Sequence, residues 1–312
     1  MKKAYHGTLN VVVATPDVLI AATDSRATII DSSGNLVGRE DNHQKLFIVP
    51  GNILVTIAGY NKVTVATAPE FTSPAAGIIL DYIDTLTAMH RTPSYDEALS
   101  SLIHLLTFNL TSVANINMWV DGSVNSNVYL FQMIVAGKRG DSFVMTKVNL
   151  ELKLNGDVKS EYYIISETSK IIEKKVTSFT YLTAGWDDVA NDVLKNVKGV
   201  PKSDEMEQAI RDSMQKTNVK NQGVGGVVQQ ASLSQGGLNV NIPNYPRPDG
   251  PRIKYNLWVG GGFSNNTIAV KSHVPFLFIS SSFENTGVIL DGNYFNSIGT
   301  APIYERLPAM DD

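Results

Sequence analysis

The sequence contains no cysteine, which excludes disulfide bonds and metal sites built from thiolates. Histidine is scarce as well, and the five histidines never recur at the spacing of a metal-binding pair: His6, His43, His90, His104 and His273. Because neither kind of ligand occurs in a suitable pattern, we expect the protein to bind no metal.

Long apolar runs and blocks of like charge are also missing. The most apolar stretches, Val11 to Val13 and Val18 to Ala22, are interrupted well short of the roughly 20 residues that a membrane helix needs. The 26 basic and 30 acidic residues are mixed along the chain and leave a formal net charge of -4. We therefore expect no membrane-spanning segment and no nucleic-acid partner.

The basic N-terminus, Met1 to Ala4, is not followed by the apolar segment of a signal peptide. A cytoplasmic location is favoured on this basis, and secretion stays open if a signal peptide has already been removed. With 312 residues, 43% of them hydrophobic, the chain is typical of a folded globular protein.

Strand patterns and helix patterns alternate along the chain. The first sixty residues predict a β meander, with β-branched runs separated by turn signals such as Asp31 to Asn35. Two helices with start signals follow, after Ser73-Pro74 and after Ser94. A second β region, two helices and a last strand come next, at about 128–184, 187–197, 203–216 and 224–233. Gly236 to Arg252 predicts a linker, and the remaining residues are strand-like.

A glycine followed by a threonine, Gly7-Thr8, stands near the start of the chain. Cleavage between them would leave Thr8 with an amine and a hydroxyl on adjacent carbons, so one residue could supply both general base and nucleophile. A nearby ammonium such as Lys45 would lower the pKa of that amine, and a carboxylate such as Asp24 would keep the lysine charged and oriented. Taken singly, each of these residues could instead belong to a turn or to the surface.

Together these residues and their neighbours resemble the proteasome β-subunit type of N-terminal nucleophile (Ntn) hydrolase. The resemblance rests on four pieces in the family's order: His-Gly-Thr8, Thr-Asp24-Ser-Arg-Ala-Thr, Gln-Lys45-Leu-Phe and Thr-Ile-Ala-Gly59. It implies an α+β fold, a four-layer αββα sandwich, and self-cleavage at Gly7-Thr8. It also implies that Thr8 is the nucleophile, that Asp24 and Lys45 support it, and that the backbone N–H of Gly59 faces the oxyanion.

The resemblance further implies a domain organisation and a substrate class. Residues 1–7 would be a propeptide, 8–235 the Ntn hydrolase domain, and 236–312 a strand-rich C-terminal extension that packs on the core. Thr8 would hydrolyse a peptide or another amide without a cofactor, with Ala27 and Ile57 lining the pocket for the substrate residue before the cut. Members of the family assemble in rings, and the extension leads us to expect a smaller homo-oligomer or a monomer.

The chain departs from the family pattern at three positions. Trp186 stands where the family has a serine that helps to position the terminal amine, and Asn221 and Val224 stand where it has an aspartate and a serine. These departures leave a second interpretation open, a catalytically silent proteasome-like structural or assembly protein. An amidase that acts on a small secreted or cell-wall molecule is a third.

Overall fold

The computed structural model describes most of the first 243 residues and four short strands beyond them: 8–30, 36–59, 74–121, 129–155, 162–165, 170–243, 256–260, 267–271, 277–279 and 287–289. The chain divides into two compact units. The first comprises Met1–Thr67 and Ser73–Pro248, and the second comprises Ala68–Thr72 and Asp249–Asp312. All the described residues of the candidate site belong to the first unit.

The first unit contains a five-stranded antiparallel sheet in the order β11, β1, β2, β12, β13. The turn between β1 and β2 is closed by a bond from the N–H of Thr15 to the oxygen of Val18, at 2.8 Å. The strands are β1 (Leu9–Ala14), β2 (Val18–Thr23), β11 (Thr180–Gly185), β12 (Gln229–Ser234) and β13 (Gly237–Asn241). The N-terminal strands β1 and β2 thus pair with strands from much later in the sequence, β11 and β12.

A second antiparallel sheet has the order β10, β8, β7, β6, β5, with β9 paired to β8. Gly51 and Asn52 form the turn between β5 and β6 with positive φ angles, which these residue types tolerate. The strands of this second sheet are β5 (Leu46–Val49), β6 (Ile53–Gly59), β7 (Tyr129–Arg139), β8 (Ser142–Asn155), β9 (Tyr162–Ile165) and β10 (Lys170–Lys175). A hairpin of β3 (Ala27–Ile30) and β4 (Leu36–Glu40) lies between β2 and β5 in the sequence.

The described helices are α1 (Pro74–Ala88), α2 (Tyr95–Asp121), α3 (Asp188–Leu194) and α4 (Ser203–Lys220). The predicted serine cap of α2 is present, since the Oγ of Ser94 accepts the N–H of Glu97 at 3.2 Å. At the start of α4, the Oε2 of Glu205 accepts the N–H of Lys202 at 2.8 Å. Acceptors of this kind satisfy backbone donors that have no partner within the helix.

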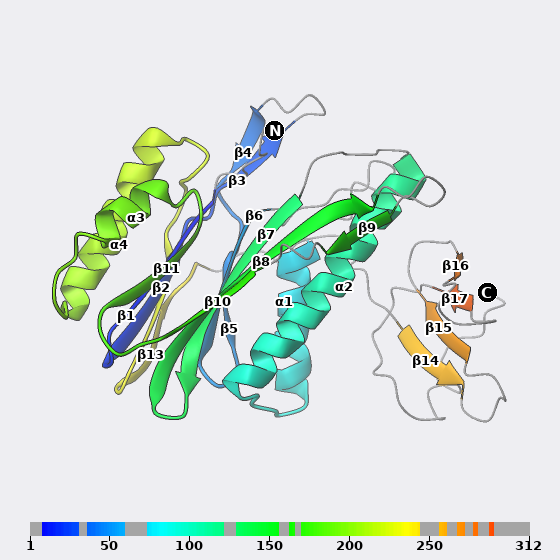
Figure 1. Cartoon of the computed structure of the whole chain (residues 1–312), viewed down its shortest axis with the longest axis horizontal. Helices are drawn as coiled ribbons and strands as arrows, with labels where there is room; N and C mark the ends of the chain where they lie inside the picture. Colours follow the sequence, from blue (N-terminus) through cyan, green and yellow to red (C-terminus); the bar gives the residue numbers. More distant parts are fainter. Residues whose placement is uncertain are drawn as a thin grey trace. The chain divides into compact units, whose positions relative to one another are not determined.

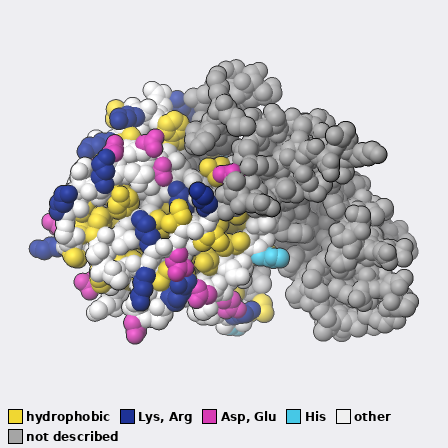
Figure 2. All heavy atoms as spheres, in the orientation of Figure 1, with side chains coloured by type: hydrophobic (Ala, Val, Ile, Leu, Met, Phe, Trp, Pro, Cys, Tyr) yellow, Lys and Arg dark blue, Asp and Glu magenta, His cyan; other side chains and the backbone are white. Residues whose placement is uncertain are grey.

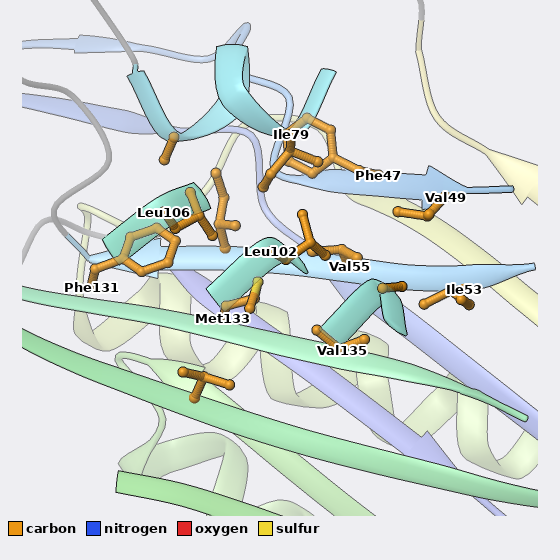
Figure 3. Packing of buried hydrophobic residues seen from close by; sticks show 14 of the residues in the cluster. Phe47, Val49, Ile53, Val55, Ile79, Leu102, Leu106, Phe131, Met133 and Val135 are labelled. Atoms are coloured by element: carbon orange, nitrogen blue, oxygen red, sulfur yellow. The ribbon is translucent and has the colours of Figure 1, made fainter. Parts of the chain in front are cut away.

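Three hydrophobic clusters join the elements in the order helices, sheet, sheet, helices. Val11 and Val13 of β1 pack with α3 and α4, whereas Val12 and Ala14 face the second sheet. The other face of the second sheet packs against α1 and α2, where its strands contribute Phe47, Ile53, Val55, Met133 and Val135 and the helices contribute Ile79, Leu102 and Leu106 (Figure 3). Each sheet is therefore covered on both faces (Figure 1).

The described strands of the second unit form two antiparallel pairs. Asn256–Gly260 (β14) pairs with Thr267–Lys271 (β15), and Leu277–Ile279 (β16) pairs with Gly287–Ile289 (β17). The strand-like sequence predicted for this part of the chain is thus confirmed at these segments.

The prediction of an α+β fold is confirmed, because the structure combines helices with antiparallel sheets. Several predicted boundaries differ. Helix α3 ends at Leu194 rather than at about 197, and α4 continues to Lys220 rather than ending at about 216. The strand expected from Val224 begins only at Gln229, since a turn at Gln222 and Gly223 is followed by Gly226 with a φ of +77°. The predicted linker from Gly236 begins with strand β13, which extends the first sheet to Asn241.

The surface of the described residues carries charges of both signs. On the face drawn in Figure 2, Lys and Arg side chains are interspersed with Asp, Glu and hydrophobic side chains. Within the described ranges, no helix is long and apolar enough to cross a membrane. No group of three or more His, Cys, Asp or Glu side chains in those ranges could hold a metal ion.

Tyr95 anchors the first turn of α2 to the second sheet. Its hydroxyl donates to the backbone oxygen of Val135 at 3.0 Å and lies 2.7 Å from the Oγ1 of Thr146, which can donate in return. Burial raises the pKa of Tyr95 to about 12. We expect Tyr95→Phe to lower the free energy of unfolding by about 1–2 kcal/mol near neutral pH, because a buried carbonyl oxygen then loses its donor.

The same substitution should change the response to alkaline pH. Because the pKa of Tyr95 is higher in the folded chain than in the unfolded chain, its stabilising effect is complete below pH 10 and is lost as the pH rises towards 12. The difference between wild type and Tyr95→Phe in urea unfolding should therefore shrink between about pH 10 and 12. A difference that stays constant over that interval would contradict this role.

Candidate active site

Thr8 is the first residue that the structure describes, and it leads into β1. Side chains alternate between the two faces of a strand, and Val12 and Ala14 face the second sheet. Thr8 belongs to the same alternating series and is only 3% exposed. The predicted nucleophile is therefore buried at one end of the interface between the sheets.

Lys45 immediately precedes β5, and its side chain is 0% exposed. An ammonium group has three hydrogens to donate, and three oxygens lie around the Nζ of Lys45. The Oγ1 of Thr8 accepts at 2.8 Å, the Oδ1 of Asp24 accepts at 3.2 Å, and the backbone oxygen of Arg26 is the third acceptor. Such a set of acceptors favours the charged form of the lysine.

Asp24 follows the last residue of β2, and backbone N–H groups hold both of its carboxylate oxygens. Its Oδ1 accepts the N–H of Leu9, the residue that follows Thr8, at 2.9 Å. Its Oδ2 accepts the N–H of Gly225 at 3.0 Å and that of Arg26 at 3.2 Å. The carboxylate thus ties together β1, the end of β2 and the loop before β12.

Burial acts in opposite directions on the pKa values of this pair. It raises the pKa of the Asp24 carboxyl and lowers the pKa of the Lys45 ammonium, because both charged forms lose contact with water. The attraction between the two groups opposes both shifts, as do the N–H groups of Gly225 and Leu9 at the carboxylate. The two charges therefore depend on each other inside the protein.

The backbone of Thr8 is held by the turn that follows β11. The N–H of Trp186 donates to the oxygen of Thr8 at 2.8 Å. Gly185 lies so close that a Cβ there would stand 1.9 Å from that oxygen, and its φ of +86° also favours glycine. The position where the family has a serine thus contributes its backbone N–H here, while the Trp186 residue is 39% exposed.

Gly59 lies at the end of β6, and its neighbour Ala58 lies close to Gly185 in the turn that follows β11. A Cβ built on Gly185 would lie 3.5 Å from the Cβ of Ala58, so this end of β6 is close to the backbone of Thr8. Gly59 has a φ of +87°, and a Cβ there would stand 2.2 Å from the oxygen of Leu130. Both crowding and backbone conformation require glycine at the position for which the resemblance implies the oxyanion donor.

The two predicted pocket residues occupy different surroundings. Ile57 is 0% exposed and belongs to the cluster between the second sheet and helices α1 and α2, on the face of β6 opposite to Ala58. Its N–H donates to the oxygen of Lys45 at 3.1 Å. Ala27 is half-buried at the start of β3. The structure thus places Ile57 in a packed core, and Gly7 lies outside the described residues.

The loop after α4 supports Asp24 with its backbone. The oxygen of Gly225 accepts the N–H groups of Ser25 at 3.2 Å and Arg26 at 3.1 Å, while its own N–H binds Asp24. Of the two departures from the family pattern in this loop, Val224 is buried in the cluster with α4, and the Oδ1 of Asn221 accepts the N–H of Gly223 at 2.8 Å. Main-chain groups thus reach Asp24 from a segment whose side chains differ from the family.

Two glutamines that the sequence does not single out also hold the site. The Oε1 of Gln132 on β7 accepts the N–H of Gly185 at 2.8 Å, and its Nε2 donates to Asn149 at 2.8 Å. Gln229 on β12 binds the backbone on both sides of Lys45. The alternation of β12 could have marked Gln229 as buried, since it shares a face of the strand with Ala231 and Leu233.

The structure thus brings Thr8, Asp24 and Lys45 together and places β6 beside them. A buried hydroxyl next to an ammonium can act as a nucleophile, because the positive charge stabilises the alkoxide that forms on attack. No family model matches the sequence, and no curated protein matches it either. The case for a function therefore rests on this geometry and on the motifs.

Proposed function

We propose that the protein is a threonine amidohydrolase of the Ntn type that cuts its own chain between Gly7 and Thr8. The observation that carries the proposal is the contact of 2.8 Å between the Nζ of Lys45 and the Oγ1 of Thr8, with Asp24 bound to the same ammonium. All three residues are buried, so water screens their charges weakly. A purely structural ion pair would not require a hydroxyl as its third member.

The first reaction would be processing of the chain. The Oγ of Thr8 adds to the carbonyl carbon of Gly7, its proton passes to the nitrogen of Thr8, and the C–N bond breaks to leave an ester between Gly7 and Thr8. Water hydrolyses the ester, which releases residues 1–7 with a free carboxylate. Thr8 is left with both an amine and a hydroxyl.

The second reaction would use the new terminus on a peptide or another amide. The amine has an ordinary pKa of about 7.7–8.0, and the Lys45 ammonium beside it would lower this value, so that the amine can take the proton of the hydroxyl near neutral pH. Thr8 then forms an ester with the acyl group of the substrate, and the amine activates the water that hydrolyses it. The N–H of Gly59 would stabilise the oxyanion of each tetrahedral intermediate, an effect worth roughly 3–4 kcal/mol in acyl transfer.

The arrangement of the layers supports the same proposal. Helices cover the outer face of each antiparallel sheet, and the inner faces pack against each other. We infer the four-layer αββα sandwich of the Ntn hydrolases from this order. Thr8 at the start of β1, between the two sheets, is where such a sandwich would hold its nucleophile.

The mass of the intact, purified chain tests the proposal directly. We expect loss of the seven residues Met1–Gly7, followed by acylation of Thr8 when the protein is treated with a β-lactone, because a lactone ring opens on an activated hydroxyl. A chain that keeps these residues and does not react with the lactone would overturn the proposal. That outcome would favour the catalytically silent, proteasome-like structural protein.

A further inference from the structure

Gln229 makes three hydrogen bonds to the backbone around Lys45. Its Oε1 accepts the N–H of Lys45 at 2.9 Å and that of Leu46 at 3.0 Å, and its Nε2 donates to the oxygen of His43 at 2.7 Å. The residue is 0% exposed. One side chain thus fixes the main chain before and after the lysine that contacts Thr8.

Gln229 also belongs to a row of buried polar side chains that crosses the first sheet. Gln229 on β12 is paired with Thr23 on β2, which is paired with Asn10 on β1. The Oγ1 of Thr23 donates to the Oδ1 of Asn10 at 2.6 Å, and all three residues are 0% exposed. Thr8 lies two residues before Asn10 and Asp24 lies one residue after Thr23, so the row adjoins both.

A glutamine in this place is costly unless its amide is fully bonded. Burying such a group without partners costs roughly 1–3 kcal/mol, judged from protein mutational data. An apolar side chain would avoid that cost but would leave two N–H groups and a carbonyl oxygen without partners, so the backbone would have to move. Reaction rates respond strongly to shifts of about 1 Å in the position of a catalytic group.

We infer that Gln229 is the positioning residue that keeps the Nζ of Lys45 within hydrogen-bond distance of Thr8. The inference rests on the proposed function, since it concerns the same site. Gln229 does not contact Thr8 through any of these three bonds and acts through the backbone at Lys45. Its amide fits this task because it accepts from two N–H groups and donates to a carbonyl oxygen at the same time.

Two substitutions and one matched control test this role. Gln229→Met keeps the length of the side chain and removes all three hydrogen bonds. Gln229→Glu keeps the shape and can make all three bonds only while its carboxyl group is protonated. Gln230→Met makes the same chemical change one residue along β12, on the opposite face of the sheet.

The measurements are the loss of residues 1–7 after cell-free synthesis and the acylation of Thr8 by a β-lactone from pH 5 to 9, both followed by intact mass. We expect Gln229→Met to slow both reactions at least tenfold while Gln230→Met matches the wild type. For Gln229→Glu, the rate relative to the wild type should fall at least fivefold as the pH rises and the new carboxyl group ionises. Lys45, Asp24 and His43 are titratable groups near residue 229. Because the wild type and Gln229→Glu share them, their titration does not account for a difference between the two pH profiles.

These measurements separate positioning from a merely structural role. Because an ionised, buried carboxylate also destabilises the fold, rates are taken per folded molecule at each pH. A merely structural role would lower the folded fraction of Gln229→Glu but would leave its rate per folded molecule equal to that of the wild type at every pH. The inference is overturned if folded Gln229→Glu has the wild-type rate and profile, and this test stands even if Gln229→Met does not fold. If instead the wild type neither loses residues 1–7 nor reacts with the lactone, it is the proposed function that fails.

Discussion

Replacing Thr8 by alanine should abolish both the cleavage after Gly7 and the acylation of the chain. Alanine removes the hydroxyl that the Nζ of Lys45 contacts at 2.8 Å, and no other hydroxyl would share a residue with the new terminal amine. Thr8→Ala should therefore keep the full-length mass after purification. Circular dichroism should show the fold intact, because the substitution removes only two heavy atoms, Oγ1 and Cγ2, just before β1.

Serine at the same position provides a graded comparison. Thr8→Ser keeps the hydroxyl but loses the methyl group that restricts χ1, so it should process more slowly and still release residues 1–7. Thr15→Ala is a matched control, since Thr15 is a buried threonine (2% exposed) at the far end of β1, and it should be processed like the wild type. If Thr8→Ala were still cut after Gly7 and acylated at the wild-type rate, the assigned nucleophile would be wrong.

The sequence predicts which residues meet at this site better than it predicts how they are held. Thr8, Asp24 and Lys45 are recognisable because their chemistry requires particular side chains, and the structure brings these three together. The supports of Asp24 are N–H groups of Leu9, Arg26 and Gly225. Every residue except proline has such a group, so its part in the site leaves no mark on the sequence.

The sequence places Ile57 in β6 correctly but does not show which layer packs on each face of the strand. Its role in a substrate pocket stays a prediction. Here Ile53, Val55 and Ile57 face helices α1 and α2, whereas Leu54 and Ala58 face the other sheet. Both faces of β6 are apolar, so periodicity alone could not distinguish them.

Weak patterns also hide elements of the fold. In β10, Ile171 and Ile172 are adjacent and are 61% and 41% exposed, so the strand lacks the alternation that marks a half-buried strand. It forms because its backbone pairs with β8 at the edge of the second sheet. Similarly, β13 follows a Gly-rich turn and exposes most of its side chains, yet it pairs with β12.

Removing both members of the Asp24–Lys45 pair should cost less stability than the sum of the two single substitutions. Lys45→Met leaves a buried carboxylate without its cation, and Asp24→Asn leaves a buried ammonium without its anion. Breaking a buried ion pair in this way typically costs roughly 3–5 kcal/mol of stability. Since the double variant contains neither charge, we expect it to recover about 1–3 kcal/mol relative to the sum of the single variants.

Urea unfolding of the wild type, the two single variants and the double variant measures the coupling between Asp24 and Lys45. An exposed pair of the same residue types provides the control. Lys195 and Asp192 also form an ion pair, but their side chains are 60% and 67% exposed, so water and salt screen the charges. Their cycle should show much weaker coupling. Processing adds a second readout: the double variant should regain stability without regaining cleavage after Gly7, because the hydroxyl of Thr8 has lost its ammonium partner. Equal, additive effects in the two cycles would mean that Asp24 and Lys45 act as independent charges.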